Sequence, residues 1–184
     1  MPVQTPICDF GKKALPFELK STDNKIISLD DIKGENGTLI MFICNHCPYV
    51  KAITKEIVED CNELKKIGIN SVAICSNDFI NYPEDSFDNM IKFSKDNQFS
   101  FPYLQDETQK IAKKYDAVCT PDFFGYDKDL GLQYRGRLRE LKNFVSVKDG
   151  KSDLLKAMKQ IAETGKGPQD QIPSAGCGIK WKYD

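Results

Sequence analysis

Two cysteines three residues apart are the residues of this chain best suited to chemistry. Cys44 and Cys47 lie in the run Cys44-Asn45-His46-Cys47-Pro48. The nucleophilic form of cysteine is the thiolate, which a nearby positive charge or hydrogen-bond donor stabilises. His46 is the only histidine of the chain and lies between the two cysteines, where it can supply that charge when protonated. We therefore predict dithiol–disulfide chemistry, with Cys44 as nucleophile, Cys47 as resolving partner and His46 tuning both.

Metal binding is another use of paired cysteines. A structural zinc site usually takes four protein ligands at matched spacing. The chain has no second Cys-x-x-Cys, so a zinc site would have to combine Cys44, Cys47 and Cys119 with His46. A thiol metallochaperone would need His46 as its third ligand, and His46 lies too close in sequence to both sulfurs to complete such a site easily. We predict no metal and no organic cofactor, so electrons must come from an external thiol reductant.

The number of cysteines is the unusual feature of the composition. The chain has seven, and its start, from Met1 to Pro6, lacks the basic-then-apolar pattern of a secretion signal. An odd number of cysteines without such a signal favours reduced thiols and a cytoplasmic location over a disulfide framework. Cys61 and Cys75 fall on the apolar faces of predicted elements, so we interpret both as packing residues.

Length and charge exclude several classes of protein. A chain of 184 residues corresponds to roughly one domain. Lys and Arg number 26 and Asp and Glu 27, and the resulting net charge of −1 gives no bulk attraction to nucleic acid or anionic lipid. The longest apolar run, Leu39 to Cys44, is too short for a membrane-spanning helix. We predict a globular protein whose partners are neither nucleic acid nor membrane.

The cysteine pair lies at a junction between a predicted strand and a predicted helix. Residues 38–43 form a continuous apolar and β-branched run, typical of a strand buried on both faces. Apolar residues then recur at three- and four-residue spacing from Val50 to Leu64, which predicts an amphipathic helix ending at Gly68. Residues 70–75 predict a second buried strand. The three elements form a βαβ unit, so we expect an α/β fold with a parallel sheet at its core.

The rest of the chain divides into a domain and a tail. The pattern predicts an N-terminal hairpin from 17–20 and 25–29, helices over 86–97 and 108–115, a hairpin from 122–126 and 132–134, and a last helix capped by Ser152. After Gly165 the composition shifts to Gly, Pro and polar residues. We predict a domain over residues 1–164 and an extended C-terminal tail over 165–184 that packs on it.

A second group of candidate residues surrounds Pro121. It follows Cys119 and Thr120 at the start of a predicted strand. Proline is unusual there unless its peptide bond is cis or the strand lies at a sheet edge. An ordinary turn proline would explain Pro121 by itself equally well.

Several stretches together resemble one protein family over nearly the whole chain. They are Phe42 to Val50, Ser76 to Asp78, Tyr82 to Ser86, Phe101 to Leu104, Cys119 to Phe124, Tyr134 to Arg137, and Pro173 to Lys182. The sequence resembles the thioredoxin-like redoxins, in the peroxiredoxin-like branch of the AhpC/TSA group. The resemblance implies a thioredoxin fold with an N-terminal β-hairpin and a strand–helix insertion. It also implies that Pro121 is cis and faces the cysteine pair, and that the backbone of Thr120 pairs with an incoming substrate chain.

Two activities are compatible with this resemblance. A thiol–disulfide oxidoreductase would act on a disulfide-containing protein or a small thiol. A thiol peroxidase would reduce hydroperoxides, and Cys47-Pro48 resembles its peroxidatic Cys-Pro step. Peroxidases of this group have a proline seven residues and a threonine three residues before that cysteine, where this chain has Ile40 and Cys44. The missing hydroxyl favours disulfide chemistry, and the residues leave the direction of electron flow open.

Two arginines and two further cysteines complete the candidates. Arg135 and Arg137 would share one face as alternate residues of a strand, where their guanidinium groups could bind an anionic group of a substrate. The alternative is that both arginines are solvated and only keep an exposed strand edge from pairing with another chain. Cys119 and Cys177 are candidate additional thiols. Cys177 could resolve an oxidised cysteine, but its neighbours favour a simpler role in which the tail is anchored in a groove.

Overall fold

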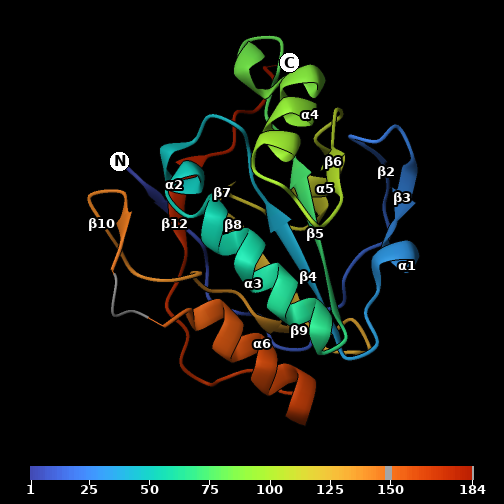
Figure 1. Cartoon of the computed structure of the whole chain (residues 1–184), viewed down its shortest axis with the longest axis vertical. Helices are drawn as coiled ribbons and strands as arrows, with labels where there is room; N and C mark the ends of the chain where they lie inside the picture. Colours follow the sequence, from blue (N-terminus) through green and yellow to red (C-terminus); the bar gives the residue numbers. More distant parts are fainter. Residues whose placement is uncertain (148–150, 184) are drawn as a thin grey trace.

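The central element of the structure is a seven-stranded mixed sheet in the order β3-β2-β6-β5-β4-β8-β9 (Figure 1). This computed structural model describes residues 1–147 and 151–183. The strands are β2 (Glu18–Ser21), β3 (Ile26–Ser28), β4 (Gly37–Phe42), β5 (Ile69–Cys75), β6 (Tyr103–Gln105), β8 (Asp122–Tyr126) and β9 (Leu132–Tyr134). Strands β4, β5 and β6 run parallel, and β8 pairs antiparallel with β4. The predicted βαβ unit and both hairpins are present.

Strand β4 is the most enclosed strand of the sheet. It lies between β5 and β8, and all six of its residues are buried. Alternate side chains enter two different cores, with Leu39 and Met41 in one and Ile40 and Phe42 in the other. Burial on both faces explains why the sequence of this strand is continuously apolar instead of alternating.

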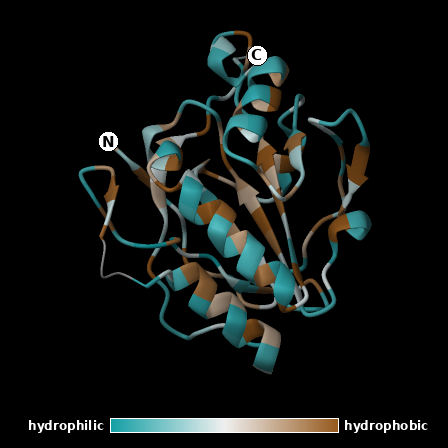
Figure 2. Cartoon of the chain, viewed as in Figure 1, coloured by the Kyte–Doolittle hydropathy of each residue, from teal (hydrophilic) through white to brown (hydrophobic). Residues whose placement is uncertain are grey.

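Helices cover both faces of the sheet. The core on one face receives residues of α3 (Thr54–Lys66), α4 (Phe87–Asp96) and α6 (Asp153–Thr164). The opposite core receives residues of α1 (Leu29–Ile32) and α5 (Lys110–Lys114). The long helix α3 crosses the front of the sheet, and its outward side is mainly hydrophilic (Figure 2). No helix in the described part of the chain is both long and apolar enough to cross a membrane.

The helix predicted after the cysteine pair is in fact two helices. Helix α2 covers Pro48–Lys51, and α3 begins only at Thr54. Ile53 separates them, because its backbone at φ −122° and ψ 7° leaves the α-helical region. The apolar periodicity continues through this break, since Val50 and Ile57 both enter the same core. A periodic pattern therefore could not reveal the interruption.

The tail contributes a strand to a second, three-stranded sheet of order β1-β12-β7. Its strands are β1 (Val3–Gln4), β12 (Ala175–Gly178) and β7 (Cys119–Thr120), and both pairings are antiparallel. Ile179 is buried directly after β12, and Trp181 packs against the same core. The sequence patterns missed strands β1, β6, β7 and β12 and the short helix α1. They also missed a small hairpin of β10 (Leu141–Lys142) and β11 (Val145–Ser146).

Candidate active site

Cys44 and Cys47 lie at the carboxyl end of β4, where the chain turns into α2. Cys47 is the N-cap residue of α2, and Pro48 occupies the first helical position, where a missing N–H costs nothing. Both side chains are buried, with relative exposures of 1% and 0%. Both sulfurs contact Thr120. Cys44 Sγ is 3.4 Å from the hydroxyl oxygen of Thr120, and Cys47 Sγ is 3.2 Å from its carbonyl oxygen.

The surroundings of the two sulfurs favour the thiolate at Cys47. A hydrogen bond with the Cys44 thiol lowers the pKa of Cys47 to about 4, and interactions with Cys177, Thr120 and the Val50 backbone act in the same direction against the effect of burial. The contact of Cys47 Sγ with the Thr120 carbonyl oxygen favours the protonated form of Cys47. The hydrogen-bond donors around this sulfur outnumber that one acceptor. The same interaction with Cys47, together with burial, raises the pKa of Cys44. The directions of the two pKa shifts therefore favour a thiolate on Cys47 over one on Cys44.

A buried carboxylate approaches Cys44 from a different part of the chain. Asp85 belongs to the short 3-10 helix η1 (Pro83–Asp85), and its side chain is fully buried. Its Oδ2 lies 2.6 Å from Nδ1 of His46, without the alignment of a linear hydrogen bond. The His46 ring lies parallel to the Tyr82 ring, with 6.1 Å between centroids. Asp85 also accepts hydrogen bonds from the backbone N–H of Asn45 and the side-chain amide of Asn77, both at 2.8 Å.

Asn45 links this carboxylate to the core. Its side-chain amide donates to the Glu84 carbonyl at 3.0 Å, and its Oδ1 accepts from the Tyr103 hydroxyl at 2.8 Å. The sequence patterns did not identify Asp85, Asn45 or Tyr103 as site residues. Sequence spacing alone offered no signal for Asp85, although it falls in one of the stretches that resemble the redoxin family.

Cys44, His46 and Asp85 form the one group among the described residues that could hold a metal ion, since their ligand atoms all lie within 4.8 Å of one another. This set differs from the combination weighed from sequence, because Asp85 takes the place of Cys47 and Cys119. A thiolate, an imidazole and a carboxylate are ligands that zinc accepts. The prediction that the protein binds no metal therefore stays a prediction.

The Thr120–Pro121 peptide bond is cis, as the family resemblance implied. Thr120 contacts both sulfurs of the pair and belongs to β7, which pairs with the tail strand β12. Cys119 is buried beside it, and its sulfur points to the carbonyl of Pro121 at 3.6 Å. Burial raises the pKa of the Cys119 thiol well above its usual value. The structure thus brings Thr120 to the pair. The sulfur of Cys119 points to Pro121 instead, and its raised pKa makes it unreactive.

Cys177 lies next to the pair on the tail. In the register of β12 with β7, Cys177 is opposite Thr120. Its side chain is half-buried and packs against the core that contains Cys44 and Cys47. Burial, with a contribution from the thiol interaction with Cys47, raises the pKa of Cys177 to about 11. The tail is anchored by Ile179, and it also brings a third sulfur to the site.

Arg135 and Arg137 do not share a strand face, which corrects the sequence-based expectation. Strand β9 ends at Tyr134, so both arginines follow it in irregular structure. Arg135 is buried and paired with Asp122 at 2.9 Å. Arg137 is half-buried and pairs with Asp153 at 2.7 Å. Arg135 is therefore engaged within the fold rather than presented to a substrate.

A cleft of about 250 Å³ adjoins the cis-proline. Its walls include Tyr49, Pro121, Arg137 and Ser174, so it lies beside both α2 and the tail. Of the two predicted substrate-binding arginines, Arg137 is the one that lines it. This cleft is the open space next to the pair in which a substrate group could lie.

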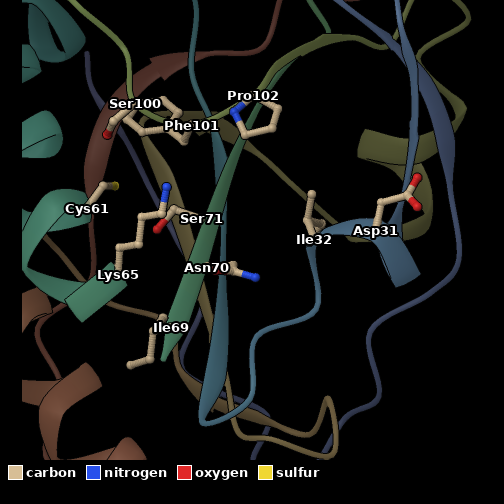
Figure 3. A pocket seen from close by; sticks show the side chains of 10 residues that line it. All are labelled: Asp31, Ile32, Cys61, Lys65, Ile69, Asn70, Ser71, Ser100, Phe101 and Pro102. Atoms are coloured by element: carbon tan, nitrogen blue, oxygen red, sulfur yellow. The ribbon is translucent and has the colours of Figure 1, made fainter. Parts of the chain in front are cut away.

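A different pocket lies at the other end of the sheet (Figure 3). It has a volume of about 190 Å³, and Cys61, Lys65, Ile69 and Ser71 are among its lining residues. Ile69 begins β5, whereas Cys44 follows the end of β4, and these two strands run parallel. Burial raises the pKa of Cys61 to about 12, so its thiol is unreactive at neutral pH. We assign the pocket no part in the chemistry of the pair.

Comparison with known proteins identifies relatives of the whole chain. A family model described as the AhpC/TSA family matches residues 10–140. An uncharacterized conserved protein from Geobacillus kaustophilus is 42% identical, with a TM-score of 0.94 over 100% of this chain and 98% of that chain. A hypothetical protein from Sinorhizobium meliloti 1021 is 31% identical, with a TM-score of 0.91 over 100% of both chains. No curated protein matches the sequence significantly.

A more distant likeness concerns the fold alone. A thiol:disulfide interchange protein of the thioredoxin family from Chlorobium tepidum TLS is 14% identical, with a TM-score of 0.64 over 83% of this chain and 97% of that chain. The predicted α/β fold of thioredoxin type is thereby confirmed, as is the resemblance read from the sequence motifs.

Proposed function

The chain belongs to the AhpC/TSA family, and we propose that it is a thiol–disulfide oxidoreductase with Cys44 and Cys47 as its reacting pair. One observation carries the proposal: two adjacent sulfurs meet at Thr120 beside a cis-proline, and the pKa of one of them is well below its usual range. A lowered pKa keeps the nucleophilic thiolate populated at neutral pH. The three-residue spacing allows the second sulfur to complete a disulfide.

The lowered pKa supports a different division of roles from the one predicted from sequence, with Cys47 as the attacking thiolate. The Cys47 thiolate attacks one sulfur of a substrate disulfide, which forms a mixed disulfide and releases the other substrate sulfur as a thiolate. Cys44 then loses its proton and attacks the Cys47 sulfur. The Cys44–Cys47 disulfide forms, and the second substrate thiolate leaves. The substrate gains the two electrons that the pair loses.

His46 and Asp85 are suited to the second step. Cys44 is the protonated member of the pair, so it needs a base before it can attack. A His46 nitrogen lies within 4.8 Å of the Cys44 sulfur, and the Asp85 carboxylate stabilises the imidazolium that results from proton transfer. Thioredoxin-type sites often have a buried acid in the strand before the pair. Here Asp85 on η1 could supply that carboxylate.

The remaining partners are part of the same proposal. We expect the protein to act in the cytoplasm on a small or protein-borne disulfide, with an external thiol returning electrons to the pair. Neither nucleic acid nor membrane is expected as a partner, since the net charge of −1 offers no bulk attraction.

A redox titration of peptide 34–51 tests the proposal. Trypsin cleaves after Lys33 and Lys51, so both cysteines of the pair lie in this peptide. Incubation of the protein in glutathione buffers of graded potential should remove two hydrogens from the peptide in a single two-electron transition. Cys61→Ser, which changes a buried packing thiol, should titrate like the unchanged protein. If peptide 34–51 keeps two free thiols at every potential, even in the most oxidising buffer, the pair is ruled out as a redox centre.

Peroxide reduction is a second candidate, supported by the same thiolate. Cys47 precedes Pro48, and its thiolate could attack a hydroperoxide to give a sulfenic acid and an alcohol or water. Cys44 would then condense with the sulfenic acid to a disulfide and water. Peroxide added to the reduced protein separates the two activities. A second-order rate no faster than that of free cysteine would eliminate the peroxidase, whereas disulfide exchange would be unaffected.

A further inference from the structure

The tail strand β12 is held against the residue that contacts both sulfurs of the pair. Cys177 lies opposite Thr120 in the antiparallel register, and the carbonyl oxygen of Thr120 lies 3.2 Å from Cys47 Sγ. Gly176 approaches that carbonyl so closely that a Cβ in its place would collide with it. The strand therefore lies directly over the site, and a backbone edge that could receive a substrate strand is already paired with this chain's own tail.

The three sulfurs differ sharply in accessibility. Cys44 and Cys47 are 1% and 0% exposed, whereas Cys177 is half-buried. The thiol of Cys177 interacts with the Cys47 sulfur and helps to stabilise its thiolate. An external thiol can therefore reach Cys177 more easily than either sulfur of the buried pair, and Cys177 itself interacts with the Cys47 sulfur.

We propose that Cys177 is the third redox thiol of this centre and that it transfers the disulfide of the buried pair to external thiols. The proposal rests on the function proposed above. The Cys177 thiolate attacks the Cys47 sulfur of the Cys44–Cys47 disulfide. The Cys47–Cys177 bond forms, the Cys44–Cys47 bond breaks, and the proton lost by Cys177 ends on Cys44. One disulfide and one thiol are present before and after, so this step needs no outside oxidant or reductant.

An external thiol completes the transfer at the accessible sulfur. Its thiolate attacks Cys177, and Cys47 leaves as a thiolate. A second external thiol then attacks the mixed disulfide, which releases the oxidised external disulfide and restores Cys177. Attack falls on Cys177 because its sulfur is the more accessible one in this disulfide, whereas Cys47 is fully buried.

Cys119 is not an alternative third thiol. It is fully buried, and its sulfur points to the carbonyl of Pro121, so an external thiol cannot reach it as it reaches Cys177. Cys8 is half-buried like Cys177, but no contact joins it to Cys44 or Cys47 among the described residues, and it interacts with Gln171 instead. Cys8 therefore serves as the matched control.

Peptide mapping of the oxidised protein tests the proposal. Trypsin places Cys44 and Cys47 in peptide 34–51 and Cys177 in peptide 167–180. A Cys44–Cys47 disulfide stays within peptide 34–51, whereas a Cys47–Cys177 disulfide joins the two peptides. After oxidation with oxidised glutathione and alkylation of free thiols, we expect both species in the wild type. Cys44→Ser should give the joined peptides almost completely, and the Cys47→Ser variant should give neither Cys47-containing species.

A rate measurement distinguishes transfer from mere proximity. Reduced glutathione should reduce the oxidised Cys177→Ser protein about tenfold more slowly than the wild type, because attack must then occur at a buried sulfur. Cys8→Ser should leave the rate unchanged. Absence of the joined peptides from both wild type and Cys44→Ser, with an intact disulfide inside peptide 34–51, would overturn the role of Cys177 and leave the proposed function standing. Absence of both disulfides would overturn the proposed function itself.

Discussion

The carboxylate of Asp85 holds the imidazole of His46 beside Cys44, with 2.6 Å between Oδ2 and Nδ1. The two residues come from different segments, one from η1 and one from the turn between the two cysteines. The contact places the imidazole between a buried carboxylate and the sulfur of Cys44. In the proposed mechanism Asp85 therefore acts on Cys44 through His46, as a positioning residue.

Replacement of Asp85 should slow closure of the Cys44–Cys47 disulfide. We expect Asp85→Asn to lower the rate by about tenfold, because His46 loses the group that stabilises its charge after proton transfer. The pH profile of this rate should also differ from that of the unchanged protein, because the carboxylate that contacts His46 is missing. Stopped-flow trapping of the mixed disulfide measures this step, and Asp88→Asn, at an exposed carboxylate on α4, is the matched control. Equal closure rates and pH profiles in both variants would contradict the role given to Asp85.

The reduced protein should contain one thiolate well below neutral pH. Because the pKa of Cys47 is lowered to about 4, its thiolate persists as pH falls from 8 to 6, whereas an ordinary cysteine with pKa about 8.5 is protonated over that range. Absorbance at 240 nm, as the difference between the wild type and Cys47→Ser, measures it. Cys44→Ala should move the transition to higher pH, since Cys44 is the largest cause of the lowered value. A transition near pH 8.5 in the wild type would refute the thiolate assignment.

The two glycines that flank Cys177 should respond differently to substitution. Gly176→Ala would drive a methyl group into the Thr120 carbonyl, so β12 must move away from β7. We expect less of the Cys47–Cys177 disulfide after oxidation and a lower melting temperature. Gly178→Ala is the matched control, because its Cβ would meet only Val3 at 3.5 Å. Equal yields of joined peptides in both variants would show that the position of β12 does not govern this disulfide.

The ion pair of Arg135 with Asp122 should matter for stability rather than chemistry. Arg135→Met would leave the Asp122 carboxylate buried and unpaired, at a cost of about 3–5 kcal/mol in the free energy of unfolding. Arg137→Met breaks a more exposed pair with Asp153 and should cost at most about 1 kcal/mol. Urea denaturation of both variants measures the difference. Equal losses would mean that the burial of the Arg135 pair has no energetic consequence.

Local patterns predicted the main helices and every strand of the central sheet except β6, which has only three residues. Strand β4 is apolar throughout because both its faces are covered, and α6 begins at Ser152 because that hydroxyl accepts from the Leu155 N–H. The break at Ile53 escaped detection because the apolar face continues across it. Strands of two residues such as β1 and β7 carry too little periodicity to be seen.

Spacing alone identified candidate site residues only where they are neighbours in sequence. Cys44, His46 and Cys47 share one turn, so their spacing made them candidates. Thr120 and Pro121 became candidates through the family resemblance, and Cys177 as a further thiol on the tail. Asp85 reaches the same place through tertiary packing, and no spacing links it to the pair. The assignment of the thiolate also depended on three-dimensional surroundings, because the donors to Cys47 come from Cys44, from the start of α2 and from the tail.

The antiparallel pairing of Cys177 with Thr120 has a thermodynamic consequence for the oxidised chain. About 130 residues separate Cys47 from Cys177, whereas Cys44 and Cys47 are three apart. A disulfide across the long interval would remove loop-closure entropy from the unfolded chain, worth about 5 kcal/mol in the chain-entropy model, and the short one much less. Movement of the disulfide from one partner to the other would therefore change the resistance of the whole chain to unfolding without changing the number of electrons that the centre holds.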